Sequence, residues 1–169
     1  MGSGCPAGTV AENISGDNQS FTLAFSEYIA EIGPNISRRE RRKICTILVD
    51  LAIPAGFRFT LVDVDYRGFA DLDEFVRGIV QAKYFFQGDP TAVRSRHFFE
   101  GPIFDNYEER DTFGVVSFSP CGGGKTLVFD TEVAVYKLLG SAPDAGGAMG
   151  VDTITSTFDQ RYAIVWEAC

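Results

Sequence analysis

The sequence predicts an all-β fold, an antiparallel β-sandwich that two disulfides hold together and that contains at most one short helix. Apolar residues recur at every second position in several short runs, which Gly, Pro and Asp residues separate. Four cysteines are spread along the chain without a Cys-x-x-Cys pair. About ten short runs at this spacing favour a sandwich over a parallel α/β sheet.

The composition is that of one globular domain. The 169 residues are 45% hydrophobic and 22% charged, and no stretch of about 18 apolar residues predicts a membrane span. The net charge of −8 repels phosphate backbones and anionic lipid headgroups, which disfavours nucleic acid and membranes as partners. We expect a single domain over residues 5–169. Residues 1–4 are expected to be an added start methionine and a flexible N-terminus.

The cysteines and the asparagines both indicate an oxidising secretory route. Cys5, Cys45, Cys121 and Cys169 are even in number and fit two disulfides, with four free thiols as the alternative. Four cysteines allow three pairings. We prefer Cys5–Cys45 and Cys121–Cys169, because each bridge would tie a chain end to a nearby strand.

Three of the four asparagines begin Asn-x-Ser triplets, which are acceptors for N-glycosylation in secreted proteins. These candidate glycosylation sites are Asn13, Asn18 and Asn35. Together with the cysteines they predict an extracellular glycoprotein.

Strands are expected wherever the period-two pattern is clear. These runs are residues 20–25, 43–53, 57–66, 80–86, 97–104, 112–118, 126–136 and 161–166. After Leu61 the apolar parity flips, which predicts a β-bulge near Leu61–Val62 or a strand buried on both faces. Residues 71–80 also have helical spacing behind a capping box of Asp71 and Glu74, so a short helix is the alternative there. Loops are expected over 33–42, 87–93 and 140–150.

Residues 63–74 are the most suggestive candidate for a metal site. They match the EF-hand calcium loop at positions 1, 3, 6, 9 and 12, but Arg67 occupies a ligand position and the entering segment alternates like a strand. A weaker calcium site would use Asp63, Asp65, Asp71 and Asp73. It requires a turn at Gly68 that brings the two aspartate pairs face to face. We favour ion pairing with Arg67 or Arg77 instead, and predict neither a metal nor a cofactor.

Other motifs have simpler structural interpretations. Residues 122–126 resemble the end of a P-loop but lack its first glycine and its following helix, so we expect a turn. The basic segment 38–43 is expected to be a solvated loop rather than a site for an anionic polymer or a dibasic processing site. His97, the only histidine, would have to serve any Ser–His–Asp mechanism, and no catalytic signature flanks it.

Aromatic residues could stack on sugar rings if they are exposed, although core packing is the expectation for each. The candidates are Tyr66, Tyr84, Tyr107, Tyr136 and Trp166. Within the 63–74 segment, Tyr66, Arg67 and Asp73 are the candidate ligand-binding residues.

Several motifs in order along the chain carry a family resemblance. They are Gly2-Ser3-Gly4-Cys5-Pro6-Ala7-Gly8, Arg42-Lys43-x-Cys45, Val64-Asp65-Tyr66-Arg67-Gly68-Phe69-Ala70, Ser119-Pro120-Cys121-Gly122 and Trp166-x-x-Cys169. The chain resembles the domain-of-unknown-function family numbered 4360, whose members are small secreted proteins found largely in fungi. The resemblance implies an extracellular, mostly β protein and no established reaction.

We therefore predict a secreted, non-catalytic binding or effector-like module that acts on a cell wall, a glycan or a host protein. The alternatives are a secreted hydrolase that uses two carboxylates and a structural cell-wall or spore-coat protein.

Overall fold

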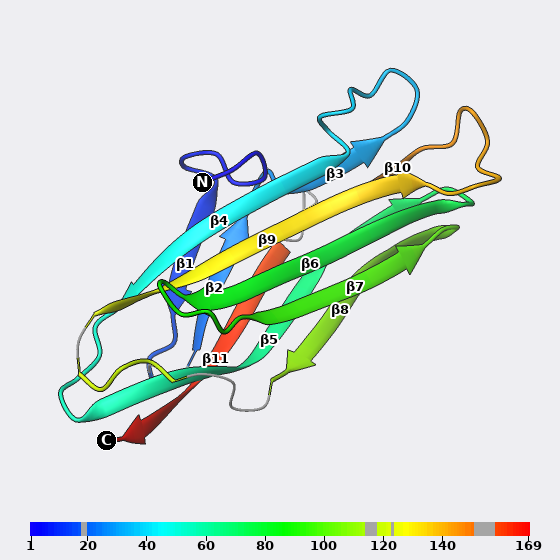
Figure 1. The fold of residues 1–169 in the computed structure, drawn as a ribbon. Helices are drawn as coiled ribbons and strands as arrows, with labels where there is room; N and C mark the ends of the chain where they lie inside the picture. Colours follow the sequence, from blue (N-terminus) through cyan, green and yellow to red (C-terminus); the bar gives the residue numbers. More distant parts are fainter. Residues whose placement is uncertain (18–19, 114–117, 123, 151–157) are drawn as a thin grey trace.

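The protein is an antiparallel β-sandwich, as predicted (Figure 1). The computed structural model describes residues 1–17, 20–113, 118–122, 124–150 and 158–169, with the backbone alone for residues 51, 62, 125 and 158–163. The strands are β1 (Val10–Ile14), β2 (Ser20–Phe25), β3 (Ile29–Ile32), β4 (Arg42–Leu51), β5 (Phe57–Leu72), β6 (Val76–Phe86), β7 (Val93–Glu100), β8 (Ile103–Thr112), β9 (Lys125–Lys137), β10 (Gly147–Gly150) and β11 (Phe158–Ala168).

The strands form two sheets that pack face to face. The smaller sheet has the order β4-β9-β6-β7, and the larger has the order β1-β2-β11-β5-β10-β3 with β8 paired to β5. Strand β6 shows why they pack: its residues alternate strictly between buried and half-buried along all 11 positions. This alternation places one apolar face against the larger sheet and leaves the other face to solvent.

Strand β5 is long and continuous, which corrects two expectations. It runs for 16 residues through Gly68, so no turn brings the aspartate pairs face to face. It ends at Leu72 and β6 begins at Val76, so the alternative helix over 71–80 is wrong. The bulge is confirmed: Leu61 pairs with Ile164 and Asp63 with Ala163, which leaves one extra residue on β5.

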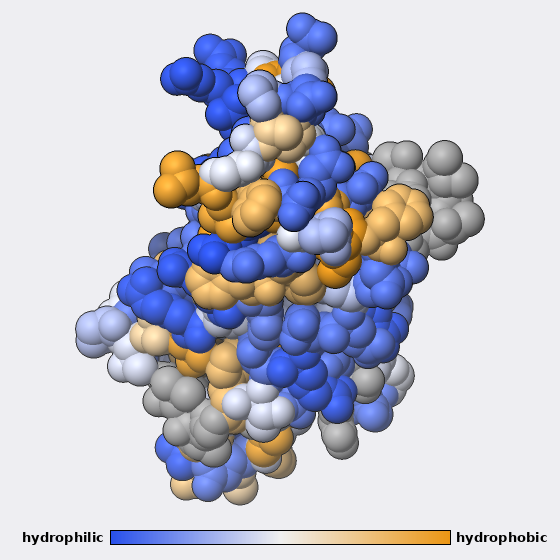
Figure 2. Space-filling view, turned by 90° about the vertical axis from the view of Figure 1, so that its right-hand side faces the viewer, coloured by the Kyte–Doolittle hydropathy of each residue, from blue (hydrophilic) through white to orange (hydrophobic). Residues whose placement is uncertain are grey.

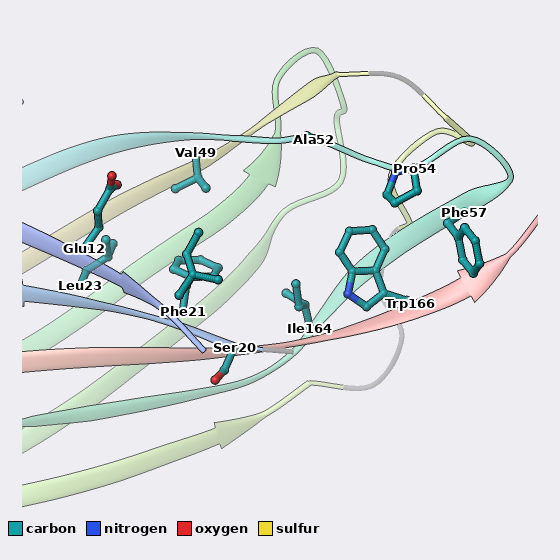
Figure 3. Close-up of a pocket in the computed structure, with 11 residues that line it drawn as sticks. Glu12, Ser20, Phe21, Leu23, Val49, Ala52, Pro54, Phe57, Ile164 and Trp166 are labelled. Carbon is teal, nitrogen blue, oxygen red and sulfur yellow. The ribbon is translucent and has the colours of Figure 1, made fainter. Parts of the chain in front are cut away.

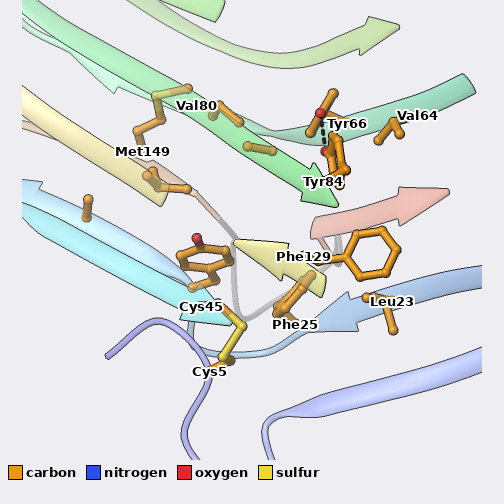
Figure 4. Close-up of a cluster of buried hydrophobic side chains, with 14 of the residues drawn as sticks. Cys5, Leu23, Phe25, Cys45, Val64, Tyr66, Val80, Tyr84, Phe129 and Met149 are labelled. Carbon is orange, nitrogen blue, oxygen red and sulfur yellow. Dashed lines mark hydrogen bonds between the residues drawn. A yellow bond between two sulfur atoms is a disulfide. The ribbon is translucent and has the colours of Figure 1, made fainter. Parts of the chain in front are cut away.

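The two disulfides join the predicted cysteines, Cys5–Cys45 and Cys121–Cys169. Cys5–Cys45 lies in the aromatic core between the sheets, where Phe25, Tyr66, Tyr84 and Phe129 also pack (Figure 4). The hydroxyls of Tyr66 and Tyr84 are hydrogen-bonded to each other within this core. The core is therefore aromatic and includes buried polar tips that satisfy one another.

Residues 1–4 lie against β4. The amide of Gly4 donates to the carbonyl of Ile44 at 2.9 Å, and the Thr46 amide donates to the carbonyl of Met1 at 3.3 Å. The adjacent disulfide between Cys5 and Cys45 ties this segment to β4.

The expected strand over 97–104 is interrupted by a tight turn. β7 ends at Glu100 and β8 begins at Ile103, with a cis peptide bond between Gly101 and Pro102. The expected loop 140–150 contains the short strand β10. In the expected strand 112–118, residues 114–117 lie outside the described residues, and β8 already ends at Thr112.

Several turns gather at one end of the sandwich, which Figure 2 shows face on. They are the β3–β4, β5–β6, β7–β8 and β9–β10 connections. Hydrophilic residues cover most of this end, and hydrophobic patches surface between them. Phe75, Phe104 and Leu139 are among the exposed apolar side chains of the molecule.

Candidate functional site

The outer face of the smaller sheet carries a shallow groove of about 680 Å³. Because side chains alternate across a strand, the outward positions of β4, β9, β6 and β7 fall on this one face. Twelve residues line the groove, and they include the cations Arg42, Lys83, Arg94 and Arg96 and the carboxylates Asp130 and Glu132. We call this surface the sheet groove.

Strand register sets two rows of side chains across the sheet groove. One row reads Thr46, Asp130, Lys83, Arg94, and the next reads Ile44, Glu132, Gln81, Arg96. Neighbouring strands lie about 4.8 Å apart, so each row spans roughly 14 Å. Each row therefore presents donors and acceptors along a line, on a rigid sheet rather than on loops.

Both carboxylates of the groove have partners. Thr46 Oγ1 donates to Asp130 Oδ1 at 2.7 Å, and an Arg42 guanidinium nitrogen lies 2.6 Å from Glu132 Oε2. The hydrogen bond from Arg42 to Glu132 raises the pKa of this exposed guanidinium. Neither carboxylate forms an ion pair with Lys83, Arg94 or Arg96 in the described part of the chain, although Asp130 lies opposite Lys83 in the β6–β9 register.

Lys83, Arg94 and Arg96, which we call the cationic cluster, are neighbouring cations of the groove. Arg94 and Arg96 are exposed, and none of the three forms an ion pair with any residue that the structure describes. Lys83 lies directly opposite Arg94 in the β6–β7 register, while its ammonium sits 4.4 Å from the centre of the Phe85 ring. Like charges directly opposite each other destabilise a sheet.

Two aromatic rings stand on the same face, towards one end of the groove. Phe98 follows Arg96 at the next outward position of β7 and is 54% exposed, and Tyr136 on β9 is 42% exposed. The Arg77 guanidinium lies 5.6 Å from the centre of the Phe98 ring. Exposed rings of this kind offer flat apolar platforms beside hydrogen-bonding groups.

The candidate ligand-binding residues from the sequence do not converge. Tyr66 is fully buried, and burial raises its pKa. Arg67 is exposed and pairs with Glu108 at 2.8 Å, while Asp73 Oδ2 accepts a hydrogen bond from the Gly146 amide at 2.6 Å. Tyr66 points into the core and Asp73 caps a turn, so the three do not share a surface.

The aspartate cluster has no calcium-like geometry. Asp65 is buried and pairs with Arg110 at 2.5 Å, while Arg67 pairs with Glu108 and Arg77 with Glu100. One oxygen of Asp63 is buried without a hydrogen-bond partner among the described residues, and Asp71 is exposed. Within the described ranges, no three His, Cys, Asp or Glu side chains are grouped as metal ligands would be.

His97 lies between Ser95 and two carboxylates, Glu109 and Asp111. Nε2 of His97 lies 3.1 Å from Asp111 Oδ2 and 3.3 Å from Ser95 Oγ, and Ser95 donates to that same aspartate oxygen. In a triad the carboxylate binds the opposite ring nitrogen from the serine. Here Nδ1 faces Glu109 at 3.5 Å, so a carboxylate–histidine–serine order is present, but Ser95 is buried and donates its proton to Asp111 rather than to His97. The group links edge strand β7 to edge strand β8.

The predicted glycosylation sites, the basic segment and the aromatic candidates do not gather at one place. Asn13 and Asn35 are exposed and stay predicted glycosylation sites, whereas Asn18 lies outside the described residues. The residues of the basic segment 38–43 have different surroundings. Arg38 and Arg39 are exposed in the β3–β4 loop, whereas Lys43 pairs with Glu40 at 2.6 Å. Of the aromatic candidates, Tyr66, Tyr84 and Tyr107 are buried, Tyr136 is beside the sheet groove, and Trp166 lines a separate cleft.

Sequence reasoning missed the cationic cluster. The available signal was the alternation of Arg94 and Arg96 with Ser95 and His97, which places both arginines on one strand face. Their meeting with Lys83 depends on the register of β6 against β7, which no local pattern specifies.

Comparison with known proteins places the chain in a family. A family model described as Domain of unknown function (DUF4360) matches residues 1–169. A protein of Arthroderma benhamiae named "Uncharacterized secreted protein" is 34% identical over 170 residues, which cover 99% of this chain and 68% of the relative.

Among solved structures, that of TmCBM61 in complex with beta-1,4-galactotriose aligns with 99% of this chain and 86% of its own, at 9% identity and a TM-score of 0.35. No helix in the described part of the chain is long and apolar enough to cross a membrane. The protein is secreted, and it belongs to the DUF4360 family.

Proposed function

We propose that this protein is a secreted, non-catalytic module that binds an acidic glycan in the sheet groove. The observation that carries the proposal is the cationic cluster, in which Lys83, Arg94 and Arg96 stand together in a protein of net charge −8. An anionic ligand would relieve the repulsion between Lys83 and Arg94, which the sheet otherwise tolerates at a cost.

The chemistry of the groove suits a carboxylated or sulfated sugar chain. An arginine guanidinium is a planar fork that matches a carboxylate or sulfate with two parallel hydrogen bonds. Gln81 and Thr46 add neutral polar groups that can bond to sugar hydroxyls. Phe98 and Tyr136 give flat surfaces on which a sugar ring can stack.

The partners of the two groove carboxylates favour binding over glycoside hydrolysis. A hydrolase needs one carboxyl as an acid and another as a base or nucleophile, both free to meet the substrate. Asp130 accepts from Thr46 and Glu132 is paired with Arg42, so both are engaged in organising the groove.

The test is the binding of acidic and neutral polysaccharides to the intact protein. We expect affinity electrophoresis and calorimetry to show binding to polygalacturonate or alginate, which weakens as salt rises, and much weaker binding to neutral galactan. The double variant R94Q/R96Q should bind at least tenfold more weakly, because two charge-assisted contacts are lost.

The matched control is R38Q/R39Q, which removes the same charge from an exposed loop and should change affinity less than twofold. Equal losses in the two double variants would replace the sheet groove with a diffuse charge effect. Release of new reducing ends from any bound polymer would contradict a non-catalytic role.

A further inference from the structure

The two lateral sides of the sandwich differ, and one of them holds a second cleft. On one side, edge strands β7 and β8 are linked by the His97–Asp111 contact and by the Phe99 and Tyr107 rings, whose centres are 4.5 Å apart. On the other side, β1 and β4 are the terminal strands of their sheets. A cleft of about 530 Å³ lies on this side, between the β1–β2–β11 edge and the end of β4.

The lining of this side cleft is almost wholly apolar (Figure 3). Trp166, Pro54 and Phe57 stand at one end, Val49 and Leu23 towards the other, and Phe21 and Ile164 lie between them. Ser20 is the only uncharged polar side chain among the described lining residues. A sugar would leave most of its hydroxyls without partners here, and burying unpaired polar groups is costly.

Among the described lining residues, one carries a charge. Glu12 is the only ionisable group among the described lining residues, and its side chain is exposed on β1. Glu12 and Leu23 also line an adjoining hollow of about 610 Å³ beside the N-terminal segment. An extended apolar chain can therefore lie in the side cleft while its head group stays near a carboxylate and near solvent.

We propose that the side cleft binds a single-chain amphipathic molecule, with its apolar chain against Trp166 and Phe57 and a cationic head group near Glu12. The volume lies within the range of small-molecule sites. Because the ligand and the residues differ from those of the sheet groove, this inference is independent of glycan binding.

Trp166 is the only tryptophan in the chain, so its fluorescence reports directly on the cleft. We would titrate the intact protein with decyl-, dodecyl- and tetradecyltrimethylammonium below their micelle concentrations, and with dodecanoate. The expected result is a saturable change in Trp166 emission, with affinity rising about three- to fourfold per added methylene. Dodecanoate should bind about tenfold more weakly than the cation of equal chain length, because its charge has the sign of Glu12.

Three variants and one control locate the site. A52F adds a ring to an exposed lining position and should abolish the change in emission, while F57A should weaken binding several-fold. E12Q should remove the preference for the cation and leave the chain-length dependence intact. L139F adds a similar ring to a fully exposed residue outside the cleft and should have no effect.

The inference is overturned if no amphiphile gives a saturable change, or if A52F, shown by its thermal melt to be folded, binds as the parent does. Equal affinity for the cation and for dodecanoate in the parent protein would overturn the assignment of the head group to Glu12.

Discussion

The two disulfides close loops of similar length but sit in opposite surroundings. Cys5–Cys45 spans 40 residues and is buried, with exposures of 3% and 1%, beneath the sheet groove. Cys121–Cys169 spans 48 residues and both of its cysteines are exposed, next to the turn that precedes Phe57 of the side cleft. Loop closure predicts about 4 kcal/mol for each, so any large difference between them must come from burial.

Removal of the buried disulfide should have the largest effect. We expect C5A/C45A to lower the free energy of unfolding by about 5 kcal/mol, the sum of lost loop constraint and of the cavity left by two sulfurs. Urea unfolding of this variant beside C121A/C169A measures the difference. Equal losses would mean that burial adds nothing to the constraint.

Reduction of the exposed disulfide should come first and cost less. A thiolate must reach a sulfur to break the bond, and only Cys121–Cys169 is exposed. Under mild dithiothreitol we expect alkylation and mass spectrometry to find Cys121 and Cys169 labelled while Cys5 and Cys45 stay paired. Stability should fall by at most about 4 kcal/mol. Early labelling of Cys5 would show that the core opens before the surface bond is reduced.

High pH should lower the stability of the fold through the tyrosines of its buried core. Burial raises the pKa of Tyr28, Tyr66 and Tyr107, so these residues keep their protons when folded. Unfolded tyrosine ionises near pH 10, so above that pH the unfolded state gains stability and the fold loses it. One unit above, the loss is about 1.4 kcal/mol per buried tyrosine.

Absorbance at the phenolate band, followed together with circular dichroism, checks this sign. The three tyrosines should ionise only as the protein unfolds. Their titration near pH 10 in a protein with native circular dichroism would contradict the burial argument.

The smallest expected effect is that of one hydroxyl beside the buried disulfide. Tyr28 is fully buried, and its hydroxyl is 2.9 Å from Thr131 Oγ1, which donates to the Cys45 carbonyl at 3.2 Å. Y28F should cost about 1 kcal/mol, the usual net worth of a buried hydrogen bond. Y136F, which changes a half-exposed ring, should stay within a few tenths of a kcal/mol in the same thermal or urea measurement.

The sequence predicted well those features that depend on a local residue pattern or on the positions of the cysteines along the chain. The parity flip at Leu61 located the bulge, and the argument that chain ends need tethering selected the observed pairing of cysteines. The helix alternative over 71–80 failed because β5 and β6 pair with other strands along their whole length, and tertiary pairing overrides local spacing.

The sites were harder to predict because they depend on register and on packing between distant strands. Gly68 suggested a turn by composition, yet β8 and β5 pair straight through it, from Asp63–Thr112 to Leu72–Ile103. The side cleft needs residues from β1, β2, β4 and β11 together. Those juxtapositions are not visible in any window of the sequence, so only the folded chain reveals them.

The position of β11 has a consequence for the order in which the protein can fold. This strand follows all others in the chain, yet it lies between β2 and β5 and pairs with both. During synthesis the β1–β2 hairpin therefore has no neighbour in its sheet until β11 has been made, so the edge of β2 that pairs with β11 stays unpaired until then. An unpaired strand edge is a template for pairing with other chains, so the larger sheet is closed to such pairing at β2 only once the last strand is in place.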